Sequence, residues 1–164
     1  MKKIILAIIA GIIPLVLPAA STDFWFRHFS VEDGLSSNSV RAIMQDKYGF
    51  MWLGTDDGLN RYDGTTIKVY NLNPQGSNDY ISSLYDTTDN IWVGTEGGVY
   101  IFDYETESFE LFKVLTAQGD SIKSNVNHIA EDRDGNLWFS TVGQGIFKYN
   151  ISKHYLEHYE FKDA

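Results

Sequence analysis

The chain has 164 residues, of which 15% are aromatic and none is cysteine, and its formal net charge at pH 7 is -9. This length suits a single domain, and the lack of cysteine excludes disulfides, thiolate metal sites and thiol catalysis. An acidic surface repels phosphate backbones, and no basic cluster offsets the repulsion. The composition therefore excludes nucleic-acid binding.

The N-terminal segment has the order of a secretory signal peptide. Two lysines come first, Ile4–Leu17 is uncharged and almost wholly aliphatic, and small residues follow up to Ser21. We predict cleavage near Ser21, so that the mature protein begins close to Thr22, in the periplasm of a Gram-negative bacterium. An uncleaved membrane anchor is the alternative, although the apolar stretch is short for a bilayer and contains Pro14.

The rest of the chain contains one hexapeptide three times. Its third residue is always tryptophan, and the tryptophans are 40 and 46 residues apart. The copies are Phe50–Thr55, Asn90–Thr95 and Asn136–Thr141, with Trp52, Trp92 and Trp138 at the third position. Glycines follow at Gly58, Gly98 and Gly145, and acidic residues stand six before each tryptophan, at Asp46, Asp86 and Asp132. The second copy is one residue shorter in the turn before its tryptophan.

Each repeat is predicted to form four short strands, because β-branched and aromatic residues alternate between turn residues. In the third repeat the expected strands are 125–131, 136–141, 145–151 and 155–161. Asp134-Gly135 joins the first two strands, since an Asp-Gly pair tolerates the positive φ of a tight hairpin. No stretch after the signal has a convincing helical period. The sequence therefore predicts an all-β chain.

Repeats of about 40 to 50 residues with four strands each are typical of β-propeller blades. We predict three four-stranded antiparallel blades, an incomplete propeller, with an equivalent environment for each tryptophan in the core between blades. The Gly-Thr pairs of the hexapeptide are expected to relieve crowding where blades approach the axis. The expected segments are a signal peptide at 1–21, an N-terminal outer strand and lead-in at 22–34, and blades at 35–78, 79–123 and 124–164.

The repeats also carry a family resemblance. Residues Phe29–Asp46, Gly49–Gly64 and Glu131–Thr141 resemble the two-component-regulator propeller repeat. The resemblance covers essentially the whole mature chain. It implies the periplasmic sensor region of a hybrid two-component histidine kinase, of the kind best known in gut Bacteroidetes, where many respond to carbohydrates. It also implies further blades, a β-sandwich, a transmembrane helix and a kinase, none of which this sequence contains.

Three blades are fewer than the roughly four to eight of closed propellers. We therefore expect apolar faces that further blades of a longer chain, or self-association, would cover. Four aromatic residues before the first repeat are predicted to form an outer strand that completes the final blade of a full-length relative. These residues are Phe24, Trp25, Phe26 and Phe29.

The sequence contains no convincing catalytic constellation. The His154-x-x-x-His158 pair has helical zinc spacing, but it falls in a predicted strand that would hold the two rings apart. The segment from Asp132 to Asn136 is similar to a calcium loop without its downstream bidentate glutamate, and turn chemistry explains it better. We predict no metal site, no cofactor and no enzymatic activity in this chain.

The loops between the second and third strands are the candidate ligand-binding sites. Their polar side chains are Asp56, Asp57, Glu96 and Gln144. The leading hypothesis is a ligand-sensing module outside the cytoplasm, with carbohydrate as the ligand that the resemblance implies. The alternatives are a blade fragment of a propeller enzyme, such as a polysaccharide lyase or hydrolase, and a scaffold for protein contacts.

Overall fold

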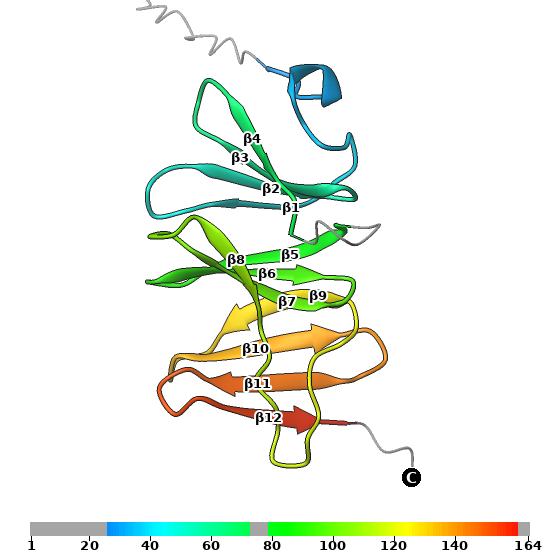
Figure 1. The fold of residues 1–164 in the computed structure, drawn as a ribbon, viewed down its shortest axis with the longest axis vertical. Coiled ribbons are helices and arrows are strands. Elements are labelled where there is room, and N and C mark those ends of the chain that lie inside the picture. Colours follow the sequence, from blue (N-terminus) through cyan, green and yellow to red (C-terminus); the bar gives the residue numbers. More distant parts are fainter. Residues whose placement is uncertain (1–25, 73–78, 161–164) are drawn as a thin grey trace, which may run out of the picture.

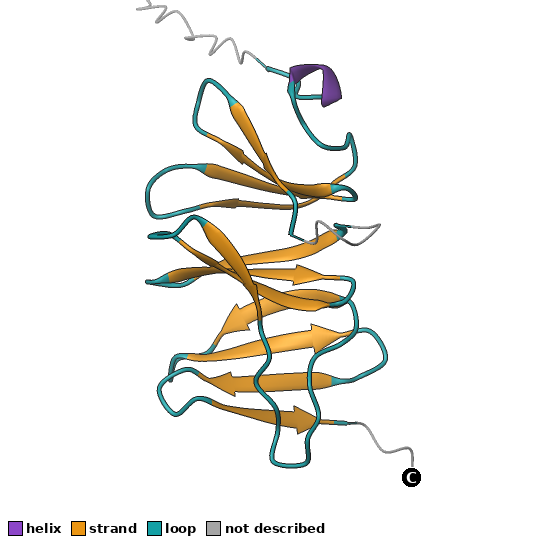
Figure 2. Cartoon of the chain, in the orientation of Figure 1, coloured by secondary structure: helices purple, strands orange, loops and turns teal. Residues whose placement is uncertain are grey.

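Three four-stranded antiparallel sheets follow one another along the chain (Figure 1). The computed structural model describes residues 26–72 and 79–160. The predicted signal peptide and the aromatic residues Phe24 and Trp25 lie outside the described residues. Within the described ranges, strands and loops account for everything except one short helical turn (Figure 2).

Each sheet contains four consecutive strands in chain order. Blade 1 consists of β1 (Val40–Gln45), β2 (Met51–Thr55), β3 (Gly58–Tyr62) and β4 (Ile67–Tyr70). Blade 2 consists of β5 (Ile81–Asp86), β6 (Asn90–Thr95), β7 (Gly98–Asp103) and β8 (Ser108–Leu111). Blade 3 consists of β9 (Val126–Glu131), β10 (Asn136–Thr141), β11 (Ile146–Asn150) and β12 (Tyr155–Tyr159). The predicted all-β architecture of three four-stranded blades is confirmed.

The core consists of two clusters that lie between neighbouring blades, one on each side of blade 2. Both faces of blade 2 are therefore buried. Between blades 1 and 2, Trp52 packs with Tyr70 and Phe102, at ring-centroid distances of 5.5 and 5.0 Å. Between blades 2 and 3, Trp92 packs with Phe112 and Tyr149, at 5.4 and 5.7 Å. The tryptophan side of blade 1 thus faces blade 2, and that of blade 2 faces blade 3.

The glycine of the hexapeptide allows the inner strands to approach closely. A Cβ added to Gly54 would lie 2.5 Å from Cγ2 of Ile81 in blade 2. A Cβ added to Gly94 would lie 2.1 Å from Oγ of Ser83 and 2.9 Å from the carbonyl oxygen of Val126 in blade 3. All three distances are too short for a real side chain, which fits the predicted role of this glycine in relieving crowding between blades.

The prediction of equivalent environments for the three tryptophans is wrong. Trp52 and Trp92 are buried, whereas Trp138 is only half-buried, because its side of blade 3 has no neighbouring blade within the described residues. Tyr159 stacks on the Trp138 ring at 5.8 Å, as Tyr70 does on Trp52. The stacking of a tyrosine on the tryptophan is thus the same in blades 1 and 3, but the tryptophan of blade 3 is less buried.

The segment before blade 1 forms a helical turn and coil. Ser30 caps the 3-10 turn η1 (Val31–Asp33), and the preceding residues from Phe26 have no strand partner. Phe29 instead packs edge-on against Tyr62, at 4.8 Å, on the outer face of blade 1. The expected outer strand would pair with a blade outside this chain, so that expectation stays a prediction. In the described ranges, no helix is long and apolar enough to span a membrane.

Candidate ligand-binding loops and hairpin turns

The candidate loops lie at one edge of the three sheets, since each joins the second strand of a blade to the third. The threonine that ends the second strand donates to the carbonyl of the following repeated glycine in every blade. The Oγ1 to O distances are 2.9 Å for Thr55 and Gly58, 3.0 Å for Thr95 and Gly98, and 2.7 Å for Thr141 and Gly145. All three glycines have positive φ, which explains the residue type at this position.

Asp56 is held in place by a basic side chain from the neighbouring strand. Its two oxygens accept from Arg41 Nε at 2.6 Å and Arg41 Nη2 at 3.2 Å. These hydrogen bonds lower the pKa of Asp56 and raise the pKa of Arg41, so both stay charged near neutral pH. The Arg41 guanidinium also lies 5.6 Å from the ring of Tyr80, at the start of blade 2.

Asp57 and Glu96 have exposed side chains at the same edge. The Glu96 backbone nitrogen donates to the Tyr80 carbonyl at 3.3 Å, which ties the second candidate loop to the segment that contacts Arg41. The structure therefore brings the Arg41–Asp56 ion pair to the ring of Tyr80 and the Glu96 backbone to the Tyr80 carbonyl. We name this group, comprising Arg41, Asp56, Tyr80 and Glu96, the loop-edge cluster.

Gln144 has a different environment from the other candidates. Its Oε1 accepts from the Lys123 backbone nitrogen at 2.9 Å, and its Nε2 donates to the Ser121 carbonyl at 3.2 Å. Both ends of the amide thus hold the connection between blades 2 and 3. Arg41 and Tyr80 were missed because nothing in the local sequence indicates a partner 15 or more residues away.

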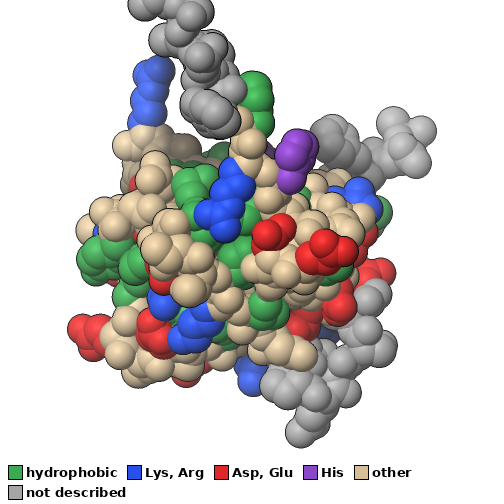
Figure 3. Space-filling model, turned by 90° about the horizontal axis from the view of Figure 1, so that it is seen from above, with side chains coloured by type: hydrophobic (Ala, Val, Ile, Leu, Met, Phe, Trp, Pro, Cys, Tyr) green, Lys and Arg blue, Asp and Glu red, His purple; other side chains and the backbone are tan. Residues whose placement is uncertain are grey.

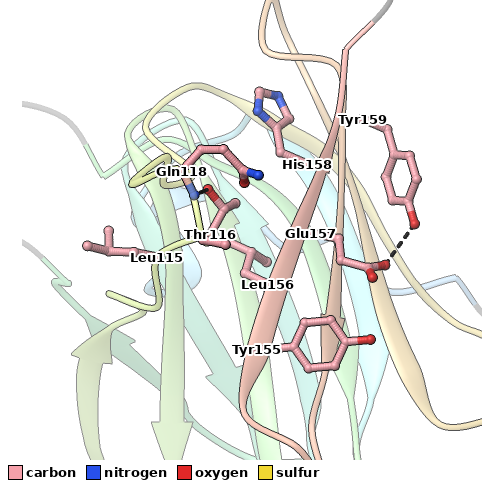
Figure 4. Close-up of a pocket in the computed structure, with 9 residues that line it drawn as sticks. Leu115, Thr116, Gln118, Tyr155, Leu156, Glu157, His158 and Tyr159 are labelled. Atoms are coloured by element: carbon pink, nitrogen blue, oxygen red, sulfur yellow. Dashed lines mark hydrogen bonds between the residues drawn. The ribbon is translucent and has the colours of Figure 1, made fainter.

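A cavity of about 650 Å³ lies between that connection and the outer strand β12 (Figure 4). Leu156 and His158 point towards the connecting loop, whereas Tyr155, Glu157 and Tyr159 point to the other side of the strand (Figure 4). This alternation follows from the two-residue period of a strand. None of the predicted site residues lines this cavity.

His158 belongs to the packing of blade 3. Its ring stacks on Phe147 at 4.1 Å, its Nε2 contacts the Gln144 carbonyl, and its Nδ1 lies 3.4 Å from Asp120 Oδ2. His154 lies in the preceding turn and contacts the Tyr149 hydroxyl instead. The two histidines therefore have separate partners, and residues 26–72 and 79–160 contain no group of three potential metal ligands.

The opposite edge of the sheets carries the hairpin turns between the first and second strands. In blade 1, Asp46 accepts from the backbone nitrogens of Tyr48 and Phe50 and, at 2.7 Å, from Trp52 Nε1. In blade 3, Asp132 accepts from Trp138 Nε1 at 2.8 Å and from Asn136. The acid six before these two tryptophans is therefore structural, and the segment after Asp132 is a turn.

Blade 2 departs from this pattern. The strand register pairs Met44 with Trp52 and Tyr85 with Trp92, so the residue equivalent to Asp46 is Thr87 and not Asp86. Thr87 Oγ1 bonds only to the backbone of Asn90. Asp86 also stands six before its tryptophan, but the shorter turn places it on the strand, as the last residue of β5.

The stacked four-stranded sheets, their inter-blade tryptophans and their hairpin acids define the chain as a run of β-propeller blades. The family model of the two component regulator propeller matches residues 34–57 and 121–143. These two segments thus carry the repeat of the two component regulator propeller family, as the sequence resemblance predicted.

Two of the solved structures that the chain resembles are extracellular domains of bacterial signalling systems. The extracellular domain of the hybrid two component system BT3049 from B. thetaiotaomicron matches 81% of the chain with 32% identity and a TM-score of 0.72. The extracellular domain of BT4673 from the same organism matches 77% with 25% identity and a TM-score of 0.65. Histidine kinase P4 of Formosa agariphila is 46% identical over 70 residues.

The chain is much shorter than these relatives. It spans 20% of the BT3049 chain, 19% of the BT4673 chain and 5% of histidine kinase P4. The resemblance therefore covers only a portion of each relative.

Proposed function

We propose that the chain is the ligand-sensing propeller segment of an extracytoplasmic sensor in a two-component system, of the hybrid histidine kinase type. The observation that carries the proposal is the BT3049 match, since 81% of this chain aligns with an extracellular domain at 32% identity. In this proposal the chain binds a ligand and transmits the binding signal. Phosphoryl transfer belongs to a kinase domain that the blades do not provide.

The ligand that the loop-edge cluster suits best is a carbohydrate. Sugars combine apolar ring faces, which pack on aromatic side chains, with hydroxyls that bond to charged and amide groups. Tyr80 supplies the ring, the Arg41–Asp56 pair lies beside it, and the exposed Glu96 carboxylate belongs to the loop whose backbone bonds to Tyr80. Asp57 lies next to this group and has an exposed carboxylate, whereas the amide of Gln144 is already engaged.

The proposed location is the periplasm, supported by the signal-like first 21 residues and by the extracellular relatives. Mass spectrometry of exported material is expected to give an N-terminus between Ala19 and Asp23. An intact Met1 would favour the uncleaved anchor.

The ligand proposal is tested by glycan-array screening of the chain, followed by calorimetry of any glycan bound. Replacing Glu96 by Gln at the loop edge is expected to weaken binding about tenfold or more, which is about 1.4 kcal/mol. The matched control is Glu110→Gln on the exposed outer strand β8, which leaves affinity unchanged. Equal effects of the two variants, or the absence of any bound glycan, would contradict the proposed site. Turnover of a glycan would support the propeller-enzyme alternative.

A further inference from the structure

Each contact between two blades joins two different faces. The tryptophan face of a blade contains the repeated tryptophan, an apolar residue of the third strand and an aromatic residue at or just after the end of the fourth. The strand register gives these positions as Trp52, Leu59 and Tyr70 in blade 1, Trp92, Val99 and Phe112 in blade 2, and Trp138, Ile146 and Tyr159 in blade 3. In blades 1 and 2 these residues are at most 8% exposed, because the next blade covers them.

The receiving face is the other half of each contact. It has five positions on the first three strands, and they are apolar or aromatic in every blade. These residues are Val40, Ile43, Met51, Leu53 and Tyr62 in blade 1, Ile81, Leu84, Ile91, Val93 and Phe102 in blade 2, and Val126, Ile129, Leu137, Phe139 and Tyr149 in blade 3. In blades 2 and 3 they belong to the two inter-blade clusters or pack against them.

The two ends of the stack each expose one half of this contact (Figure 1). On the tryptophan face of blade 3, Tyr159 is 46% exposed, and Trp138 and Ile146 are half-buried. On the receiving face of blade 1, Ile43 is 65% exposed and Val40 is 42% exposed. Within residues 26–72 and 79–160, no blade covers either of these faces.

The lead-in before blade 1 covers part of that receiving face. Phe29 packs on Tyr62 at 4.8 Å, and the Ser36 backbone nitrogen donates to Asn60 Oδ1 at 2.9 Å. Both contacts lie on the third strand of the blade. The first two strands, β1 and β2, therefore carry the apolar side chains that stay uncovered.

The two exposed faces are unlike halves of one contact, so they are complementary to each other. When identical molecules join through two unlike faces, the contact is heterologous, and it closes into a ring if the rotation between copies permits. Two copies of three blades give six blades, within the roughly four to eight of closed propellers. We propose that a second copy of the chain covers both end faces, with the tryptophan face of blade 3 in each copy packed on the receiving face of blade 1 in the other.

One residue of blade 3 weakens this association. The register places Ser140 where Gly54 and Gly94 stand in blades 1 and 2. A Cβ at Gly54 would lie 2.5 Å from Ile81 of the next blade, and the residue equivalent to Ile81 in a second copy is Val40. The Ser140 side chain therefore keeps the second copy farther away than the blades within one chain are from each other.

The test measures the association state of the full chain by sedimentation velocity over a concentration series. The wild type is expected to form a dimer. Ile43→Glu on the receiving face and Tyr159→Glu on the tryptophan face should each raise the dissociation constant about tenfold or more, because the contact would bury an unpaired carboxylate. Leu111→Glu is the matched control. It changes an exposed residue on the outer strand of blade 2, away from both end faces, and leaves the association unchanged.

A mixture of the two face variants distinguishes this arrangement from other dimers. Ile43→Glu keeps an intact tryptophan face, and Tyr159→Glu keeps an intact receiving face. An equimolar mixture should therefore form a complex of two copies, although each variant alone is monomeric. A monomeric wild type, a mixture that stays monomeric, or a dimer that is lost only in Tyr159→Glu would overturn the proposal.

Ser140→Gly supplies a variant that should associate more tightly. Glycine at this position lets Val40 of the second copy approach as Ile81 approaches Gly54, so the dissociation constant is expected to fall. Circular dichroism verifies that each variant keeps the all-β fold. A dissociation constant of folded Ser140→Gly that stays the same or rises would also overturn the proposal.

Discussion

A single carboxylate performs two structural functions in the hairpins of blades 1 and 3. Asp46 and Asp132 each accept backbone N–H groups of the turn and, with the second oxygen, the indole N–H of the tryptophan on the next strand. The turn is thereby connected directly to the inter-blade core. Hydrogen bonds to charged groups contribute about 1.5–3 kcal/mol, more than neutral ones. Blade 2 lacks this hydrogen bond between a turn carboxylate and the indole. Comparing blades 1 and 2 therefore measures how much the hydrogen bond contributes to stability.

Trp52→Phe and Trp92→Phe should therefore differ in stability. Both remove the same volume from an inter-blade core, but only Trp52→Phe removes the indole donor from Oδ2 of the buried Asp46 carboxylate. We expect the free energy of unfolding of Trp52→Phe to fall by about 1.5–3 kcal/mol more than that of Trp92→Phe. Urea denaturation followed by circular dichroism measures both. Equal losses would mean that the Asp46–Trp52 hydrogen bond contributes nothing.

The hydrogen bonds of Asp132 predict that the stability of the fold depends on pH. Hydrogen bonds from Trp138 and Asn136 hold the pKa of this carboxyl well below its usual value. Because the folded-state pKa is depressed, the stabilisation is fully present above the unfolded pKa of about 4 and is lost as the pH falls towards the folded pKa. The stability difference between wild type and Asp132→Ala should be constant from about pH 5 to 8 and smaller at about pH 3. A difference that does not shrink in acid would contradict this explanation.

At the scale of the strand, the close approach of neighbouring blades determines which residues are tolerated. Ser83 donates to the Val126 carbonyl at 2.8 Å directly beside Gly94, so β5, β6 and β9 meet at that point. The repeated hexapeptide correctly predicted the second strand of each blade and the role of its glycine at the close approach. The hairpin acids show the limit of the sequence, because Asp86 has the right spacing but the wrong register. Similarly, Gln144 gave no sign that its partners lie at 121–123.

Gly94→Ala should be destabilising, with Gly97→Ala as the control. The Cβ at position 94 would overlap Ser83 and Val126, and overpacking of this kind costs about 1–3 kcal/mol. Gly97 follows in the same segment, has no atom within 4 Å of an added Cβ and does not have positive φ. Its substitution should be neutral or stabilise slightly. Thermal melts of the two variants test this explanation. Similar melting temperatures would refute the role of Gly94 in the close approach of the blades.

At the scale of the whole molecule, blade 3 ends in a face built like those that neighbouring blades cover. Its half-buried Trp138 has Tyr159 stacked at 5.8 Å and Lys148 Nζ at 5.2 Å, as buried Trp52 has Tyr70 and Arg61. At the other end, Ile43 is 65% exposed on the outer face of blade 1, although Phe29 covers Tyr62 nearby. Seen from the blade 1 end, hydrophobic side chains lie between charged ones (Figure 3).

We expect these blades to be part of a larger propeller whose further blades cover such faces. Leaving several hundred Å² of apolar surface in water forgoes on the order of 10 kcal/mol, comparable to the net stability of a domain. Size-exclusion chromatography with light scattering, combined with a thermal melt of residues 22–164, is the most direct measurement. We predict association, aggregation or a broad, partly molten transition. A stable monomer that melts sharply would show that the three blades do not need further blades to cover their end faces.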